Sequence, residues 1–105
     1  LVGGFNVYSK KVEDTLSGHP AVGMVALIGK PDVRRPGSEI VKAFMTIDPA
    51  YEFDGNEAAL KESVIAFARE KLAPYEVPKE VEIREALPLT SVGKIDKKAL
   101  RARSK

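Results

Sequence analysis

Apolar and polar positions follow two different periods along the chain, and these periods predict strands and helices. A nearly continuous apolar run at 21–29 and an alternating run at 39–48 each have the length of a strand. A third, shorter alternation of charged and apolar residues covers 80–84. Because an exposed loop at 30–38 separates the first two runs, we expect them to pair as antiparallel neighbours.

Helical periodicity is clearest at 57–73, where apolar residues recur on one face after a good capping residue, Asn56. At about 100° per residue, Arg69 falls on the opposite, polar face of this helix. Asp96 is placed to cap a final short helix near the end of the chain. The spacing therefore predicts one long helix and one helical tail.

The N-terminal part is predicted to be extended at 1–8, where two glycines disfavour a helix, and helical at 10–17 with Ser9 as the N-cap. His19 follows this helix and is interpreted as a helix-terminus residue, not a catalyst. Together the elements predict one α+β domain over residues 1–105, with a small sheet of about three strands flanked by two main helices. Within this domain, a short glycine-rich segment comes before the first helix, and a helical tail forms the C-terminal end.

Composition excludes several classes of protein. The 105 residues are 44% hydrophobic and 30% charged, which fits a folded domain and argues against disorder. No apolar run approaches the roughly 20 residues that a membrane-spanning helix needs. With no cysteine and one histidine, thiolate chemistry and a multi-histidine metal site are excluded, and we expect no metal site in this chain. Because the first residue is Leu1, not Met, we expect a fragment or a processed chain.

Positive charge is concentrated at the C-terminal end. Residues 94–105 carry six basic side chains and one acidic one, so that a net charge of +2 combines a +5 tail with a −3 body. A basic tail is compatible with nucleic-acid binding, but no aromatic residue lies within it to stack on bases. We therefore favour a solvated helix end, whose cations complement the helix dipole, and expect no nucleic-acid partner.

The Gly93-Lys94 pair resembles the end of a phosphate-binding loop but does not complete that motif. Pro88 stands where the first glycine is required, and Ile95 replaces the hydroxyl residue that binds Mg²⁺. What remains is a lysine on a flexible loop at 90–93, able to reach an anion outside its own domain. From composition alone, such a lysine is an ordinary surface charge.

Five separated segments, taken in order, carry a resemblance to a known family. The segments read GGFNVYSKKVEDTLSGHPAV, IGKPD, EIVKAF, LAPYEVPKEVEI and ALPLTSVGKIDKKALR. They resemble the C-terminal domain of acyl-CoA synthetases, within the adenylate-forming ligase superfamily, and most of all fatty-acid–CoA ligases of medium or long chain. The resemblance covers essentially the whole chain.

The resemblance implies a two-step, AMP-forming reaction with ATP and CoA as substrates. ATP first converts a carboxylic acid to an acyl-adenylate, and the CoA thiol then displaces AMP. It also implies that an N-terminal adenylation domain of the same polypeptide is the partner and holds ATP, the acid and Mg²⁺. The C-terminal domain rotates between the two steps, and the enzyme is expected to be cytoplasmic. Without its partner, this chain is expected to be inactive.

The family pattern assigns roles to particular residues. Lys94 would be the adenylation lysine, and Gly93 would let its loop bend toward the nucleotide. Arg34 is an alternative to Arg35, because the loop that carries both looks about two residues longer than the usual pattern. The residues implied to contact CoA are Gly3, Gly4 and Phe5 in a loop along its pantetheine arm, Arg35, Arg69 and Lys79, and Val77 and Pro78 beside its nucleotide.

Some residues depart from the family pattern, and two other functions stay open. Ser9 replaces a usual proline, Lys11 a common glutamate, and Asp96-Lys97 a neutral residue followed by arginine. The first alternative is a domain that loads an acyl group onto a carrier-protein phosphopantetheine, against which Arg69 and Lys79 favour free CoA. The second is an unrelated small α+β binding module, which would not depend on Lys94.

Overall fold

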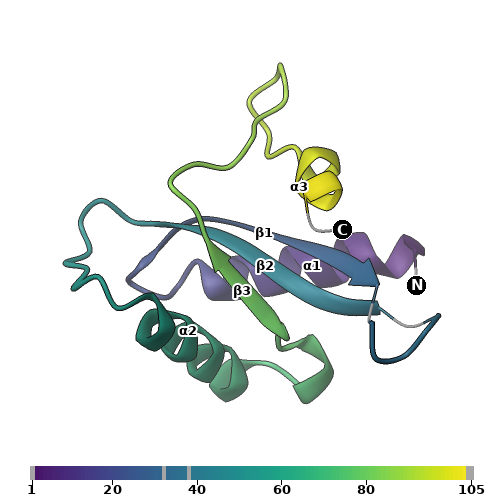
Figure 1. The fold of residues 1–105 in the computed structure, drawn as a ribbon, viewed down its shortest axis with the longest axis horizontal. Coiled ribbons are helices and arrows are strands. Elements are labelled where there is room, and N and C mark those ends of the chain that lie inside the picture. Colours follow the sequence, from purple (N-terminus) through teal and green to yellow (C-terminus); the bar gives the residue numbers. More distant parts are fainter. Residues whose placement is uncertain (1, 32, 38, 104–105) are drawn as a thin grey trace.

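The computed structural model describes residues 2–31, 33–37 and 39–103. A three-stranded sheet forms its centre, with helices on both faces (Figure 1). This arrangement confirms the predicted α+β class.

The sheet has the order β1-β2-β3 and is mixed. Its strands are β1 (Val22–Pro31), β2 (Glu39–Ile47) and β3 (Glu80–Ile83). β1 and β2 are antiparallel, as predicted, whereas β3 runs parallel to β2 after a crossover that contains the long helix. β2 is therefore the central strand, and β1 and β3 form the two edges.

Helices cover the two faces of the sheet unequally (Figure 1). The helices are α1 (Val2–Leu16), α2 (Glu57–Lys71), a 3₁₀ turn η1 (Pro74–Glu76) and α3 (Lys97–Arg103). The larger apolar core joins α1 and α2 to one face, and a smaller one joins α3 to the other face. On the second face the seven-residue α3 packs mainly against β1, and the smaller core also includes Phe44 of β2.

Strand β1 contributes to both cores, which explains its continuous apolar sequence. Val25 and Leu27 lie in the larger core, while Ala26 and Ile28 lie in the smaller one. A strand that is buried on both faces lacks the polar alternation of a half-exposed strand.

The long helix α2 begins at Glu57, as predicted. The Asn56 side chain accepts a hydrogen bond from the Ala59 amide at 3.0 Å, as an N-cap does. Leu60, Val64 and Ala68 are buried on its inner face. The helix ends at Lys71, two residues before the predicted end, because Pro74 disfavours helical backbone in the residue before it.

The predicted extended segment and N-cap at the N-terminus are wrong. Helix α1 already begins at Val2 and runs without interruption through Ser9 to Leu16. Two glycines lower helix propensity by about 1 kcal/mol each relative to alanine, a cost that packing of the later turns can offset. Val12 and Leu16 are fully buried, so the helix is anchored at its C-terminal half.

His19 connects the end of α1 to α2 from a buried position. Its Nδ1 accepts a hydrogen bond from the Ala21 amide at 3.0 Å, and its Nε2 lies 2.9 Å from the Ser63 hydroxyl. The Phe67 ring contacts the imidazole edge-on, with the ring centroids 5.3 Å apart. Because Nδ1 is an acceptor, Nε2 carries the proton of a neutral imidazole. Burial lowers the pKa of His19 below its usual 6.5.

This environment predicts that the domain loses stability in mild acid. The unfolded chain takes up a proton near pH 6.5, whereas folded His19 resists it, so the free energy of unfolding falls as pH drops below about 6.5. The slope reaches at most about 1.4 kcal/mol per pH unit and levels off below the folded pKa. Urea unfolding between pH 7.5 and 5 measures it. His19→Gln should flatten this part of the profile, and an unchanged slope would contradict the assignment.

Candidate functional site

Lys94 lies in a closed hairpin, residues 88–96, that we call the lysine hairpin. Leu89 and Ile95 form an antiparallel bridge at its base. Above the bridge, the Thr90 amide donates to the Lys94 carbonyl at 2.6 Å, and the Lys94 amide donates to the Thr90 hydroxyl at 3.2 Å. The loop predicted at 90–93 is therefore a turn closed by hydrogen bonds between its own residues and Lys94.

Gly93 is required by the geometry of this turn. Its φ of +85° is in the left-handed region, and its amide donates to the Thr90 carbonyl at 3.0 Å. Three-residue hairpin loops commonly place glycine in this conformation just before the returning strand. An added Cβ would meet no atom within 4 Å, so the demand for glycine comes from the backbone and not from crowding.

The Lys94 side chain is exposed on the hairpin, which extends away from the sheet (Figure 1). Among the described residues, no carboxylate forms an ion pair with it. Val92 and Leu89 in the same hairpin are also exposed, at 76% and 52%. The hairpin therefore presents a cation together with exposed apolar side chains, and the described part of the domain offers that cation no carboxylate partner.

Both ends of the lysine hairpin are tied to the smaller core. Leu87, before the hairpin, and Leu100, after it, are buried against Phe44 and Ile28. Asp96 accepts a hydrogen bond from the Ala99 amide at 3.1 Å and so caps α3, as predicted.

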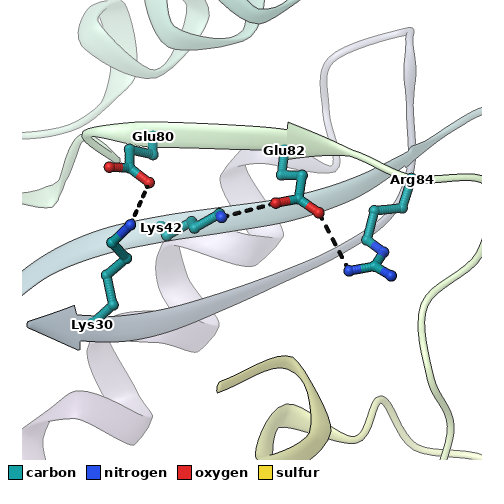
Figure 2. Close-up of polar contacts among 5 residues, drawn as sticks. All are labelled: Lys30, Lys42, Glu80, Glu82 and Arg84. Atoms are coloured by element: carbon teal, nitrogen blue, oxygen red, sulfur yellow. Dashed lines mark hydrogen bonds and ion pairs between the residues drawn. The ribbon is translucent and has the colours of Figure 1, made fainter. Parts of the chain in front are cut away.

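On the sheet face that carries α3, a row of charged residues lies beside the smaller core (Figure 2). Glu82 accepts from Lys42 at 2.8 Å and from Arg84 at 3.3 Å, and Lys30 pairs with Glu80 at 3.0 Å. The hydrogen bond from Lys42 holds the pKa of Glu82 below its usual value. Because Arg84 directly follows β3, this row also fixes the chain that leads to the hairpin.

Two shallow hollows lie near the start of β3, at the opposite end of this strand from the one that leads to the hairpin. The first, the loop hollow, has a volume of about 530 Å³ and is lined by Arg34, Arg35, Lys79 and the Lys30–Glu80 pair. Within the described part of the chain, Arg35 and Lys79 form no ion pair. The loop hollow is thus rich in positive charge, and both arginines that the sequence left as alternatives line it.

The second hollow, the helix hollow, has a volume of about 410 Å³ and lies against the end of α2. Arg69 and Lys79 provide its positive charge, and Val77 and Pro78 provide apolar surface. Lys79 lines both hollows. The structure therefore brings together five of the eight residues implied to contact CoA.

The other three, Gly3, Gly4 and Phe5, lie in the first turns of α1. The loop expected at these residues is a helix, which corrects the predicted conformation. The Phe5 side chain falls outside the described part of the chain, and so do any contacts of these three residues.

Sequence reasoning missed an ion pair that supports the helix hollow. Lys11 donates to Glu76 at 2.8 Å, and the other oxygen of this nearly buried carboxylate accepts from the Ala73 amide. The hydrogen bond lowers the pKa of Glu76 and raises that of Lys11. Lys11, noted only as a departure from the family pattern, thereby ties α1 to the turn before Val77.

Residues 2–31, 33–37 and 39–103 hold no cluster of three or more side chains suited to a metal ion. In the same residues, no helix is long and apolar enough to cross a membrane.

Comparison with known proteins places this geometry in a family. The sequence model of the AMP-binding enzyme C-terminal domain matches residues 11–94. A long-chain-fatty-acid–CoA ligase of Bacillus subtilis is 41% identical over 95% of this chain and 16% of its own length. An acetate–CoA ligase of Humulus lupulus is 43% identical over the whole chain and 18% of its own length.

Solved structures agree with the sequence comparison. The anthranilate–CoA ligase AuaEII, crystallised with anthranoyl-AMP, superposes with a TM-score of 0.78 and 36% identity. The match covers 92% of this chain and 18% of that one, so the chain spans less than a fifth of the proteins it resembles. Because the family model covers most of the chain and the shared fold includes nearly all of it, the chain belongs to the family of AMP-binding enzyme C-terminal domains.

Proposed function

We propose that this chain is the C-terminal domain of an AMP-forming acid–CoA ligase, with Lys94 as its adenylation lysine. The observation that carries the proposal is an exposed lysine, held on an ordered hairpin and left without a carboxylate among the described residues. A cation presented in this way is suited to a site completed by another domain, here the N-terminal adenylation domain with its ATP, Mg²⁺ and acid.

The chemistry of adenylation suits a lysine at this place. Negative charge builds between the attacking carboxylate and the α-phosphate, and a compact ammonium stabilises it most when water is excluded. The exposed Val92 and Leu89 provide apolar surface that can exclude water once the hairpin enters the partner domain. Lys94 then contributes in the transition state more than in the ground state, as catalysis requires.

The loop hollow and the helix hollow suit the nucleotide end of CoA. Arg35, Arg69 and Lys79 offer donors for its phosphates, and Val77 and Pro78 offer an apolar contact for its adenine ring. Because Lys79 precedes β3 whereas the hairpin follows it, the two chemical steps use separate parts of the domain. Such a separation fits a domain that rotates between adenylation and thioester formation.

For the acid, we propose a fatty acid, as in the Bacillus subtilis relative. The acetate–CoA ligase of Humulus lupulus is similar to this chain to the same extent, so the choice depends on the N-terminal domain. For the acceptor, we propose free CoA over a carrier-protein phosphopantetheine. A carrier-bound phosphopantetheine has one phosphate and no adenosine, and would leave most of the positive charge in the two hollows unused.

Arg69→Ala tests the acceptor. In the full polypeptide, we expect the KM for CoA to rise about tenfold, because a charge-assisted hydrogen bond to phosphate contributes about 1.5 kcal/mol. The KM for ATP should change less than twofold. Steady-state thioester formation at varied CoA and ATP measures both constants.

Lys71→Ala is the matched control for this prediction. Lys71 is also basic, exposed and in the last turn of α2, but it lies over the Phe67 ring and outside the helix hollow. Its removal should leave the KM for CoA unchanged. If Arg69→Ala leaves the CoA dependence unchanged as well, Arg69 does not bind the acceptor.

A further inference from the structure

We propose that Glu13 is a positioning residue for Lys94 and acts through Lys97 at the base of the lysine hairpin. The proposal rests on the proposed function of Lys94 and adds the contacts that set the orientation of this lysine. These contacts join three elements: α1, the outer edge of β1 and α3.

A single carboxylate oxygen of Glu13 makes two short contacts. Oε2 accepts from the Leu27 amide at 2.7 Å and from Lys97 Nζ at 2.8 Å. Leu27 belongs to β1, an edge strand of the sheet formed by the described residues, so Glu13 satisfies a backbone donor that this sheet leaves open. The hydrogen bond from the sheet thereby fixes the Glu13 carboxylate in the position from which it contacts Lys97.

Lys97 reaches Glu13 from α3, which lies on the opposite face of the sheet from α1. It is the first residue of α3, directly after Asp96, the last residue of the lysine hairpin. Its Nζ also lies 3.4 Å from the hydroxyl of Ser9, which is 2% exposed within α1. The Glu13 and Lys97 side chains are only 20% and 29% exposed, so solvent screens their attraction less than it screens a surface pair.

The ion pair adds a second constraint to the packing of α3. The seven-residue α3 is anchored in the smaller core by Leu100, which is fully buried. Leu87 and the partly buried Ile95 hold the hairpin in the same core, but within α3 itself a single buried side chain leaves rotation about that side chain open. A second tie at Lys97, one turn earlier, sets the orientation of α3 and of the hairpin joined to it.

The hairpin transmits this orientation because it is internally closed. The Asp96 amide donates to the Pro88 carbonyl at 2.8 Å, and the Leu89–Ile95 bridge follows immediately. A change at Lys97 therefore moves Lys94 as part of one rigid unit. Displacement of a catalytic group by about 1 Å can cost as much as a hundredfold in rate, so loss of the ion pair should slow adenylation.

Glu13→Gln in the full polypeptide tests the proposal. Glutamine keeps a carbonyl oxygen for the Leu27 amide but removes the charge that holds Lys97. We expect the rate of acyl-adenylate formation, measured by pyrophosphate exchange, to fall about tenfold. Thioester formation from supplied acyl-adenylate should change less than twofold, because that step does not use Lys94. A general loss of structure would lower both rates.

Three further variants distinguish the possible causes of slower adenylation in Glu13→Gln. Asp14→Asn removes the neighbouring carboxylate on the same helix, whose partner Lys10 lies on α1 itself, and should leave both rates unchanged. Lys97→Met should reproduce the effect of Glu13→Gln, and the double variant should be no slower than Lys97→Met alone. Lys97→Arg keeps the charge and should retain most of the adenylation rate.

The outcomes distinguish this proposal from the proposed function. If Lys94→Ala is inactive in adenylation while Glu13→Gln is fully active, the positioning role is wrong and the function stands. If Lys97→Met loses adenylation but Glu13→Gln does not, Lys97 acts directly and the positioning role is again wrong. If Lys94→Ala adenylates normally, the proposed function fails, and the positioning role fails with it.

Discussion

Replacing Lys94 by alanine in the full polypeptide should slow acyl-adenylate formation by about two to three decades. This range corresponds to the loss of one fixed, charge-stabilising donor at a transition state. Thioester formation from supplied acyl-adenylate should be largely retained, because CoA is expected at the hollows near the start of β3. Pyrophosphate exchange measures the first step, and release of AMP from acyl-adenylate and CoA measures the second.

Lys98→Ala is the matched control for Lys94→Ala, because it removes the same charge from a nearby exposed position. Lys98 is also exposed and lies four residues further along the chain, on α3, so its removal changes the net charge equally. Both half-reactions should continue at the original rates in this variant. Equal loss of both half-reactions in Lys94→Ala would contradict a specific role in adenylation and indicate a general effect on the domain.

The parts of the fold that could be predicted from the sequence are those with a local cause. Asn56 starts α2, Pro74 prevents its continuation, and apolar runs of strand length mark β1 and β2. The start of α1 could not be predicted in this way, because Gly3 and Gly4 disfavour a helix locally. Burial of the later residues of α1 outweighs that preference, and burial is a property of the whole fold.

The candidate site was predictable to the extent that the family pattern specifies it. Lys94, Arg69 and Lys79 were named from the sequence, and the structure adds that a closed hairpin and two hollows hold them. The contacts of Glu13 with Lys97, and of Lys11 with Glu76, join residues far apart in sequence. No local pattern marks such pairs, so the structure was needed to find them.

Among stability effects, we expect the largest from Phe44→Ala. Phe44 is 1% exposed and is the largest side chain of the smaller core, packed with Ile28, Leu87 and Leu100. Truncating a buried phenylalanine costs about 3–5 kcal/mol, because it removes apolar contact and leaves a cavity. The ring also lies under Lys42 Nζ, at 4.8 Å from its centroid, and that contact is lost as well. Urea unfolding of the 105-residue chain measures the change.

Two variants make this prediction decisive. Phe44→Leu keeps most of the volume and should cost clearly less than alanine, so it remains measurable if Phe44→Ala fails to fold. Val33→Ala removes apolar atoms from a side chain that is 93% exposed and should change stability by no more than about 0.5 kcal/mol. A loss below about 1 kcal/mol for Phe44→Ala would contradict a packed second core. In that case α3 and the lysine hairpin would be held by polar contacts alone, and the Glu13–Lys97 pair would be their main attachment to the sheet.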